Sequence, residues 1–173
     1  MSYRMNQDDP TAIAKHILRT VKYATLATVT SDGLPWNSPV RFVHDEELNV
    51  YWFSNKDSQH SRNVRHNGHV FIVIYDSTVT EGHGKGLYLQ ATAEELQDTS
   101  EVWAARMLIE EPLRRTAADF QGEAVRRAYK ATVRKAWING AQRSAAGLNL
   151  QDYRIEVPVA SLKVQSSAPV NSL

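Results

Sequence analysis

The stretch LNVYWFSNKDSQHSRNVRHNGHVFIVIYD, residues 48–76, joins two strand-like segments through a polar connection. The two outer parts, residues 48–54 and 69–76, are rich in valine, isoleucine and aromatic residues, which favour β-strands. Valine and isoleucine on both faces of residues 69–76 predict a strand that is covered on both sides. The connection has a single aliphatic residue, Val64, among hydroxyls, amides, imidazoles and cations. It is either a solvated loop or a surface that binds an anion.

Further strands are predicted on both sides of this stretch. Residues 24–44 form a hairpin around the turn signal SDG, and its second arm contains Pro35 and Pro39. Because proline has no N–H to donate, the first half of this arm should lie at a sheet edge or in a bulge, and only residues 40–44 are expected to be regular strand. The remaining predicted strands are residues 87–96, 129–140 and 153–159.

Two helical regions are predicted outside this stretch. Asp9 and Pro10 are typical of a helix start, and the apolar spacing that follows predicts a helix over residues 10–22. After Asp98 the pattern predicts a helical excursion to about residue 127 that Pro112 breaks. Its apolar positions are Val102, Ala105, Met107, Leu108 and Ile109. Residues 165–173 are expected to be a frayed tail.

These elements predict one domain, residues 1–173, that is mainly β. Consecutive strands joined mostly by turns favour an antiparallel β-barrel, with an N-terminal helix and a helical excursion before the last strands. A chain of 173 residues is long enough to bury a sizeable core.

Charge and cysteine content exclude several classes of function. Twenty Lys and Arg against nineteen Asp and Glu give a net charge of +1, so no global field attracts nucleic acid or a membrane. The absence of cysteine excludes disulfides, thiolate metal clusters and a cysteine nucleophile. No run approaches the ~20 apolar residues of a membrane span, and a cytoplasmic protein is expected.

The polar connection has the composition of an anion site. A short helix is predicted over residues 58–66, with Asp57 or Ser58 as N-cap. His60 and Arg62 then lie in the first turn, where unpaired backbone N–H groups and the helix dipole favour a phosphate. The alternative is a capped surface helix whose charges face water.

Four blocks, taken in order and spacing, resemble the pyridoxamine 5'-phosphate oxidase-like family. They are the hairpin ATLATVTSDGLPWNSPV, the strand end YWFS, the helix start SQHSRN, and the glycine loop with its strand, GKGLYLQATAEE. The resemblance covers about residues 24–96, and the later strands are similar to the closing strands of several members. It implies a split β-barrel of six to eight antiparallel strands. It also implies a homodimer with FMN in a cleft between subunits.

The resemblance also implies which residues bind the cofactor. Val40 and Arg41 line the isoalloxazine, and Phe53 and Ser54 meet the ring and phosphate side. The implied phosphate cradle comprises Ser58, Gln59, His60 and Arg62.

Three further residues complete this set. Lys85 and Gly86 approach the ring from the glycine loop, and Trp137 packs near the flavin from the closing strands. Many members of the family have lysine at the position of His60 and arginine at that of Gln59, so phosphate affinity is expected to be partly pH-dependent.

The leading functional hypothesis is an FMN-dependent oxidoreductase that acts on an unidentified small molecule by hydride transfer at flavin N5. Vitamin B6 oxidation is not expected, because the chain ends in SSAPVNSL and lacks the arginine-serine segment that grips the substrate phosphate in true pyridoxamine-phosphate oxidases. The alternatives are an F420-dependent reductase and a non-catalytic protein that binds flavin or haem.

Other polar clusters favour structural roles. His60, His66 and His69 are closest together, but positions six apart on a helix face away from each other, and surface imidazoles are expected instead of a metal site. A basic cluster with interleaved aromatic residues, at 126–137, is interpreted as a solvated face and not as a nucleic-acid site. The candidate substrate-pocket residues are Trp36, Trp103 and Trp137.

Overall fold

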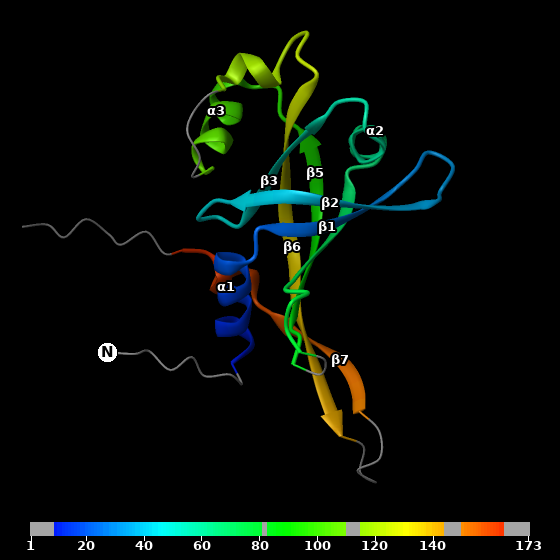
Figure 1. Cartoon of the computed structure of the whole chain (residues 1–173), viewed down its shortest axis with the longest axis vertical. Helices are drawn as coiled ribbons and strands as arrows, with labels where there is room; N and C mark the ends of the chain where they lie inside the picture. The colour runs from blue at the N-terminus through cyan, green and yellow to red at the C-terminus, as the bar shows by residue number, and fades with distance from the viewer. Residues whose placement is uncertain (1–8, 81–82, 110–114, 144–149, 165–173) are drawn as a thin grey trace, which may run out of the picture.

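The protein is a closed antiparallel β-barrel with an additional strand and peripheral helices (Figure 1). The computed structural model describes residues 9–80, 83–109, 115–143 and 150–164. The seven strands are β1 (Tyr23–Val29), β2 (Pro35–His44), β3 (Asn49–Asn55), β4 (His69–Tyr75), β5 (Gly86–Glu95), β6 (Arg126–Arg143) and β7 (Leu150–Val157). Their order is β3-β2-β1-β4-β5-β6-β7, and a further pairing between β3 and β6 closes six of them into a barrel. The predicted fold class is therefore confirmed.

The β1–β2 hairpin confirms the expected turn and the expected sheet edge. Gly33 takes the left-handed conformation, with φ of 84°, that this turn requires. Thr30 N donates to Leu34 O at 2.9 Å, so Thr30 and Leu34 form a hydrogen-bonded pair of the hairpin. Hydrogen-bonded and non-hydrogen-bonded pairs alternate along an antiparallel ladder, so Pro35 and Pro39 fall in non-hydrogen-bonded pairs and their backbone nitrogens face away from β1. β3 pairs with β2 only from Phe42 onward, which leaves that edge open and lets the strand begin earlier than predicted, at Pro35.

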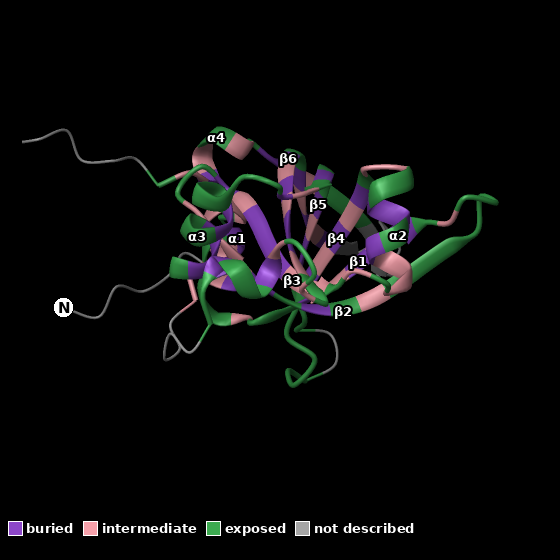
Figure 2. Ribbon diagram, turned by 90° about the horizontal axis from the view of Figure 1, so that it is seen from above, coloured by how far each residue is buried: buried purple, intermediate pink, exposed green. Residues whose placement is uncertain are grey.

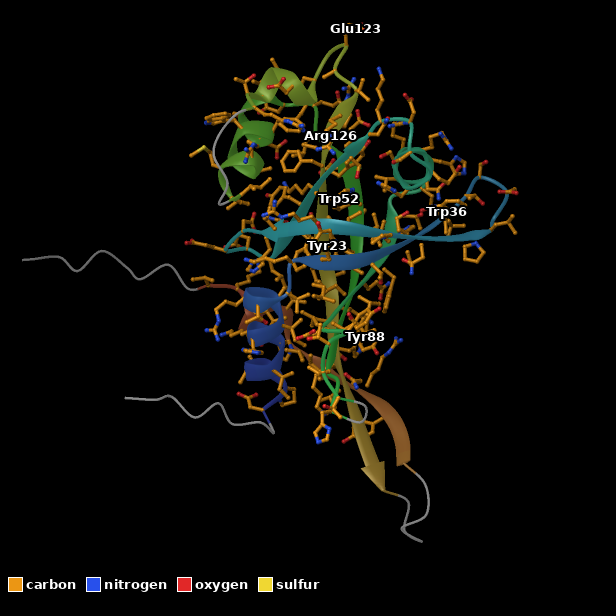
Figure 3. The ribbon with its side chains drawn as sticks, in the orientation of Figure 1. Tyr23, Trp36, Trp52, Tyr88, Glu123 and Arg126 are labelled. Atoms are coloured by element: carbon orange, nitrogen blue, oxygen red, sulfur yellow. The ribbon has the colours of Figure 1, made fainter. Side chains whose placement is uncertain are left out.

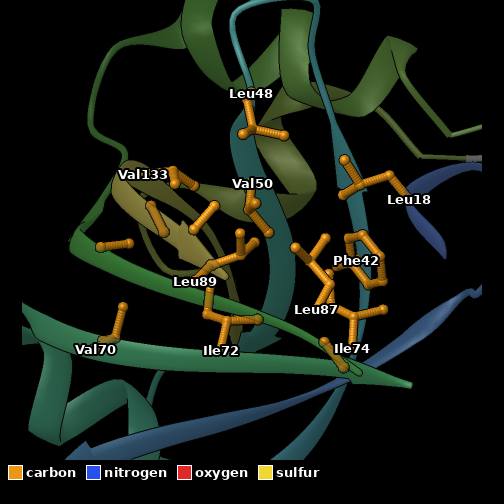
Figure 4. Packing of buried hydrophobic residues seen from close by; sticks show 14 of the residues in the cluster. Leu18, Phe42, Leu48, Val50, Val70, Ile72, Ile74, Leu87, Leu89 and Val133 are labelled. Atoms are coloured by element: carbon orange, nitrogen blue, oxygen red, sulfur yellow. The ribbon is translucent and has the colours of Figure 1, made fainter. Parts of the chain in front are cut away.

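The barrel interior is filled by aliphatic side chains from alternate strand positions (Figure 4). Figure 2 colours the buried residues along the ribbon purple. Leu26, Ile72, Ile74, Leu87 and Leu89 are at most 1% exposed. On β4, Phe71 and Val73 point outward and are only half-buried. The outer face of β4 is therefore less well covered within one chain than the sequence predicts. It is β3 that is buried on both faces, through Val50, Tyr51 and Trp52.

Helix α1 (Pro10–Thr20) begins where predicted, and the side chain of Asp9 accepts from Thr11 N at 2.9 Å. It packs Ala14, Ile17 and Leu18 onto the barrel core, together with Leu162 of α4 (Val159–Leu162). Helix α2 (Gln59–His66) joins β3 to β4. Residues 165–173, the expected tail, lie outside the described residues.

The helical excursion covers the outer face of β3 and β6. It comprises α3 (Thr99–Met107) and the 3-10 helix η1 (Ala117–Phe120), and Pro112 lies outside the described residues. A second core forms here from Tyr51, Leu96, Val102, Ala105, Ala117, Phe120 and Ala128. The prediction that Met107 lies on the apolar face of this helix is wrong, because its side chain is 51% exposed. Arg106, one helical turn beyond Val102, is buried on that face instead.

Candidate functional site

The start of helix α2 is not capped by a side chain. Ser58 is the N-cap residue, but it makes no side-chain hydrogen bond to the first amide groups of the helix. Both α1 and α3, in contrast, are capped by an aspartate, Asp9 and Asp98. The predicted helix over residues 58–66 is confirmed, and its first turn keeps the unpaired N–H groups that attract an anion.

Arg62 folds back toward this helix start. Its Nη1 donates to the carbonyl of Asp57, and its Nη2 donates to Gln59 Oε1 at 2.6 Å. The hydroxyl of Ser58 donates to Ser61 Oγ at 2.8 Å. The expected cradle residues thus surround one helix terminus, where a hydroxyl, an amide and a guanidinium are hydrogen-bonded to one another and to the helix start.

His60 connects α2 to the β1–β2 hairpin. Its Nδ1 lies 3.2 Å from Ser38 Oγ, and its Nε2 lies 3.1 Å from Ser58 Oγ. Burial lowers the pKa of His60, which favours the neutral imidazole. Asn63 Nδ2 donates to the buried Thr28 Oγ1 at 2.9 Å and fixes the helix on β1.

A cleft of about 520 Å³ opens between β2, β3 and the helical excursion. The strand β3 ends at Asn55, four residues before α2 begins, and Ser54 lies on the cleft wall. Tyr23 and Arg126, at the starts of β1 and β6, line it as well and are labelled in Figure 3. The other lining residues are Pro39, Val40, Arg41, Phe42, Val43, Tyr51, Phe53, Arg106, Ile109, Arg115 and Phe120.

The cleft combines aromatic walls with cations. The rings of Phe53 and Phe120 lie 4.6 Å apart at 52°. Tyr51 donates to Asp45 Oδ2 at 2.8 Å, and burial together with this carboxylate raises the pKa of its hydroxyl. Four arginines line the cleft, and no acidic side chain does among the residues that the structure describes.

Arg106 differs from the other arginines of the cleft because it is buried. It is 6% exposed, and its Nη1 has no hydrogen-bond partner. Arginine keeps its charge at any physiological pH, so a buried and unpaired guanidinium group costs free energy. An anionic group entering the cleft would offset that cost.

The structure brings together some of the sequence-predicted site residues and separates others. Val40, Arg41, Phe53 and Ser54 share the cleft. The four cradle residues of α2 follow closely after Ser54 in the chain but are not part of the cleft wall.

The remaining predicted residues lie elsewhere. Lys85 and Gly86 line a separate pocket of about 360 Å³, where Gly86 N donates to Asn139 Oδ1 at 2.6 Å. Trp137 lies on the outer face of β6, and its ring is 6.3 Å from that of Phe71.

Sequence reasoning missed part of the cleft. Trp36, Trp103 and Trp137 do not line it, whereas Tyr23, Tyr51, Arg106, Arg115 and Phe120 do. One signal could have identified Arg106, because an arginine four residues after Val102 falls on the apolar face of the predicted helix.

The basic cluster at 126–137 does not form one solvated face. Arg126 lines the cleft, Arg127 Nε lies 3.2 Å from Glu95 Oε1, and Lys130 Nζ lies 3.3 Å from Glu101 Oε1. The described residues contain no group of three or more His, Asp or Glu side chains that could hold a metal. None of the described helices is long and apolar enough to span a membrane.

Comparisons with known proteins agree on the fold. A heme binding protein from Mycobacterium smegmatis matches with a TM-score of 0.61 at 19% identity, over 87% of this chain and 58% of that one. HutZ, the heme storage protein of Vibrio cholerae, matches with a TM-score of 0.56 at 23% identity, over 69% and 87%. A Listeria innocua protein named as a proposed pyridoxamine 5'-phosphate oxidase matches with a TM-score of 0.53 at 22% identity, over 74% and 96%.

Two sequence comparisons complete this picture. No curated protein matches the chain. The family described as pyridoxamine 5'-phosphate oxidase matches residues 11–139, which include all of α1 except Pro10, five complete strands and most of β6. The chain therefore belongs to the pyridoxamine 5'-phosphate oxidase family.

Proposed function

We propose that the chain is an FMN-dependent oxidoreductase that acts on a small molecule. FMN would supply hydride transfer at N5. The observation that carries this proposal is the uncapped start of α2, with Ser58 and Arg62 beside it, which follows four residues after Ser54 on the wall of an aromatic cleft that no described acidic residue lines.

The residues present fit FMN. The helix terminus offers backbone N–H groups, the Ser58 hydroxyl and the Arg62 guanidinium, which together suit a phosphate. The cleft volume of about 520 Å³ lies within the range of cofactor sites. Phe53 and Val40 offer apolar surface to a flat ring, and Ser54 offers a hydroxyl where the cleft meets the helix connection.

We also propose a homodimer with the cofactor between subunits. Lys85, Gly86 and Trp137 do not line the cleft that contains Val40 and Phe53. A second copy would supply such residues from its own outer face. The half-buried aromatic side chains on this face, Tyr88, Phe71 and Trp137, support the same arrangement.

Haem is the second candidate, because two structural neighbours are named as heme proteins. A haem iron is usually held by a histidine, cysteine, methionine or tyrosine side chain. The residues that line the cleft include tyrosines but no histidine among those described, and the chain has no cysteine. Of the usual haem ligands the described cleft residues therefore offer only tyrosine, and Tyr51 already donates to Asp45. Haem is for this reason the second candidate, and F420 is a further flat cofactor for the same aromatic walls.

The test is a titration of the purified chain with FMN, F420 and haem in parallel, with mass spectrometry of any small molecule released on denaturation. The proposal predicts that FMN binds most tightly, at one molecule per chain, and that sedimentation gives a dimer. Arg62→Met should weaken FMN binding about 10-fold or more, because a charge-assisted bond to the phosphate is lost. Arg134→Met, which alters an exposed arginine outside the cleft, should not. Tighter binding of haem, or no binding of FMN, would contradict the proposal.

A further inference from the structure

Ser58, the N-cap residue of α2, does not cap its own helix. A serine at this position usually accepts a hydrogen bond from the amide of the second or third helical residue. Here its hydroxyl oxygen lies 3.1 Å from His60 Nε2, and the hydroxyl donates to Ser61 Oγ at 2.8 Å. The hydroxyl is therefore engaged away from the first amide groups of α2, and it forms no side-chain cap.

The hydrogen bonds around His60 determine which ring nitrogen carries the proton. Burial lowers the pKa of His60 and favours the neutral ring, in which one nitrogen donates and the other accepts. Because Ser58 spends its only proton on Ser61, its oxygen must accept from His60, so Nε2 is the protonated nitrogen.

The other ring nitrogen of His60 is held from the hairpin. Nδ1 is the acceptor, and the hydroxyl of Ser38 on β2, 3.2 Å away, donates to it. The oxygen of Ser38 accepts in turn from Trp36 Nε1 at 3.1 Å, and an indole N–H can only donate. Ser38 thus has its proton available for His60.

The far end of this chain of hydrogen bonds gives the same direction. Ser61 is fully buried. Burial raises the pKa of Tyr129, and a hydrogen bond from Ser61 opposes that rise, as a bond donated to the phenol oxygen does. Tyr129 itself donates to Glu95 Oε2 at 3.1 Å. Since Ser61 donates to Tyr129, it has no proton left for Ser58, and Ser58 must be the donor between them.

We propose that Ser38 is a positioning residue for the phosphate of the cofactor: through His60 it holds the Ser58 hydroxyl away from the first amide groups of α2, so that these stay open to the phosphate. The inference rests on the proposed function in that FMN supplies the phosphate. Without Ser38, the ring of His60 loses its partner at Nδ1 and can turn. Ser58 is then released to form the cap that serine prefers, and this cap competes with the phosphate.

The experiment compares FMN with riboflavin, which lacks only the phosphate, in fluorescence titrations of the full chain. Ser38→Ala should weaken FMN binding about 3- to 10-fold and leave riboflavin binding unchanged, since one hydrogen bond that orients the site is lost. Ser38→Thr keeps a hydroxyl and should restore the preference for FMN. Ser31→Ala is the control, because it removes an exposed hydroxyl from the turn of the same hairpin and should change neither affinity.

A double-mutant cycle tests whether Ser38 acts through His60. In a His60→Ala background, Ser38→Ala should cause no further loss of the preference for FMN, because coupled residues are not additive. Additive losses would overturn the inference. An unchanged preference in Ser38→Ala would also overturn it, as would equal losses of FMN and riboflavin binding, which a merely structural role would produce.

A second measurement needs no flavin. Nitrogen-15 NMR of the histidine side chains distinguishes protonated from unprotonated ring nitrogens, and the His60→Ala spectrum identifies the signals of His60. At about pH 8 His60 should carry its proton on Nε2, and its Nδ1 signal should move in Ser38→Ala but not in Ser31→Ala. A proton on Nδ1, or an Nδ1 signal that does not respond to Ser38→Ala, would overturn the inference.

The two measurements separate this inference from the proposed function. A chain that binds no FMN but shows the expected NMR signals would refute the proposed function and retain the role of Ser38 in orienting His60. A chain that binds FMN with its preference unchanged in Ser38→Ala would do the reverse. If circular dichroism shows that Ser38→Ala does not fold, the position of the proton on His60 in the wild type decides.

Discussion

Two groups of arginines lie close together in this molecule and have opposite electrostatic surroundings. Arg65 and Arg127 converge on Glu95, at 2.8 and 3.2 Å. Arg106 and Arg126, in contrast, line a cleft where no described residue is acidic. Arg126 and Arg127 are consecutive on β6, so the alternation of the strand assigns one side chain to each group.

The comparison separates structural from binding roles. The polar groups around Glu95 are already paired with one another. The hydroxyl of Tyr129 also donates to Glu95 at 3.1 Å, and the guanidinium groups of Arg65 and Arg127 donate to backbone carbonyls as well. The cleft group is open and can accept an anion. The account therefore predicts that changes at Glu95 affect stability, whereas changes at Arg106 affect binding.

The largest expected effect is that of Glu95→Gln. This carboxylate is 11% exposed and pairs with two arginines, so its loss should lower the free energy of unfolding by about 2–3 kcal/mol. Urea denaturation followed by circular dichroism measures it. Glu101→Gln is the control, because Glu101 is 50% exposed and its pair with Lys130 should contribute less than about 1 kcal/mol. Equal losses of stability in the two variants would show that the Glu95 group contributes no more than an exposed ion pair.

Tyr129 provides a pH test of the same group. Burial, together with the nearby Glu95, raises the pKa of Tyr129 to about 12. An unfolded tyrosine ionises near pH ~10, so the contribution is complete below that pH and is lost as the pH rises toward 12. Tyr129→Phe should lower stability by about 1 kcal/mol at neutral pH and reduce the alkaline loss.

Urea denaturation across this alkaline range measures the effect, with Tyr153→Phe, which alters a tyrosine that is 46% exposed, as control. Burial also raises the pKa of Tyr51, so part of the alkaline loss should remain in Tyr129→Phe. An unchanged alkaline slope in that variant would contradict the assignment.

His60 should give a smaller, pH-dependent effect on FMN binding. Burial lowers its pKa, so folding favours the neutral imidazole, and its contribution to stability is present above pH ~6.5 and lost as the pH falls. A phosphate at α2 would favour the protonated form, so FMN affinity should rise a few-fold between about pH 8 and 6. Fluorescence titrations of wild type and His60→Asn isolate this contribution from the titration of the phosphate itself. Identical pH profiles in the two proteins would exclude His60 from the cradle.

The smallest expected effect is that of Arg106→Met on stability. Because Nη1 of this guanidinium has no hydrogen-bond partner to lose, the free energy of unfolding, measured in urea, should fall by less than about 0.5 kcal/mol or rise slightly. A loss above about 1 kcal/mol would show that Arg106 is held by the protein and would remove the contrast with Glu95.

The fold could be predicted from the sequence to a large extent because its signals are local. Pro35 and Pro39 indicated an open edge, and the Asp9-Pro10 pair indicated the helix start. The closure between β3 and β6 had no local signal, since Asn49 pairs with Thr132, which lies almost half the chain length away in sequence. The same strand β6 is longer than its predicted segment, with 18 residues.

The candidate site divides in the same way. The cradle at α2 is one contiguous segment, so the hydroxyl and cation pattern at Ser58 and Arg62 made it visible in the sequence. The cleft cations come from β2, α3, β6 and the segment before η1, and only the packing of the excursion on β3 brings them together. Spacing along the chain carries no information of that kind.

The most direct test of the central claim compares the affinities of FMN and riboflavin, which differ only in the phosphate. If the start of α2 holds that phosphate, wild type should bind FMN about 10- to 100-fold more tightly than riboflavin. The double variant Ser58→Ala, Arg62→Met should bind the two equally. Equal affinities in the wild type, or a preference that survives in the double variant, would contradict the account.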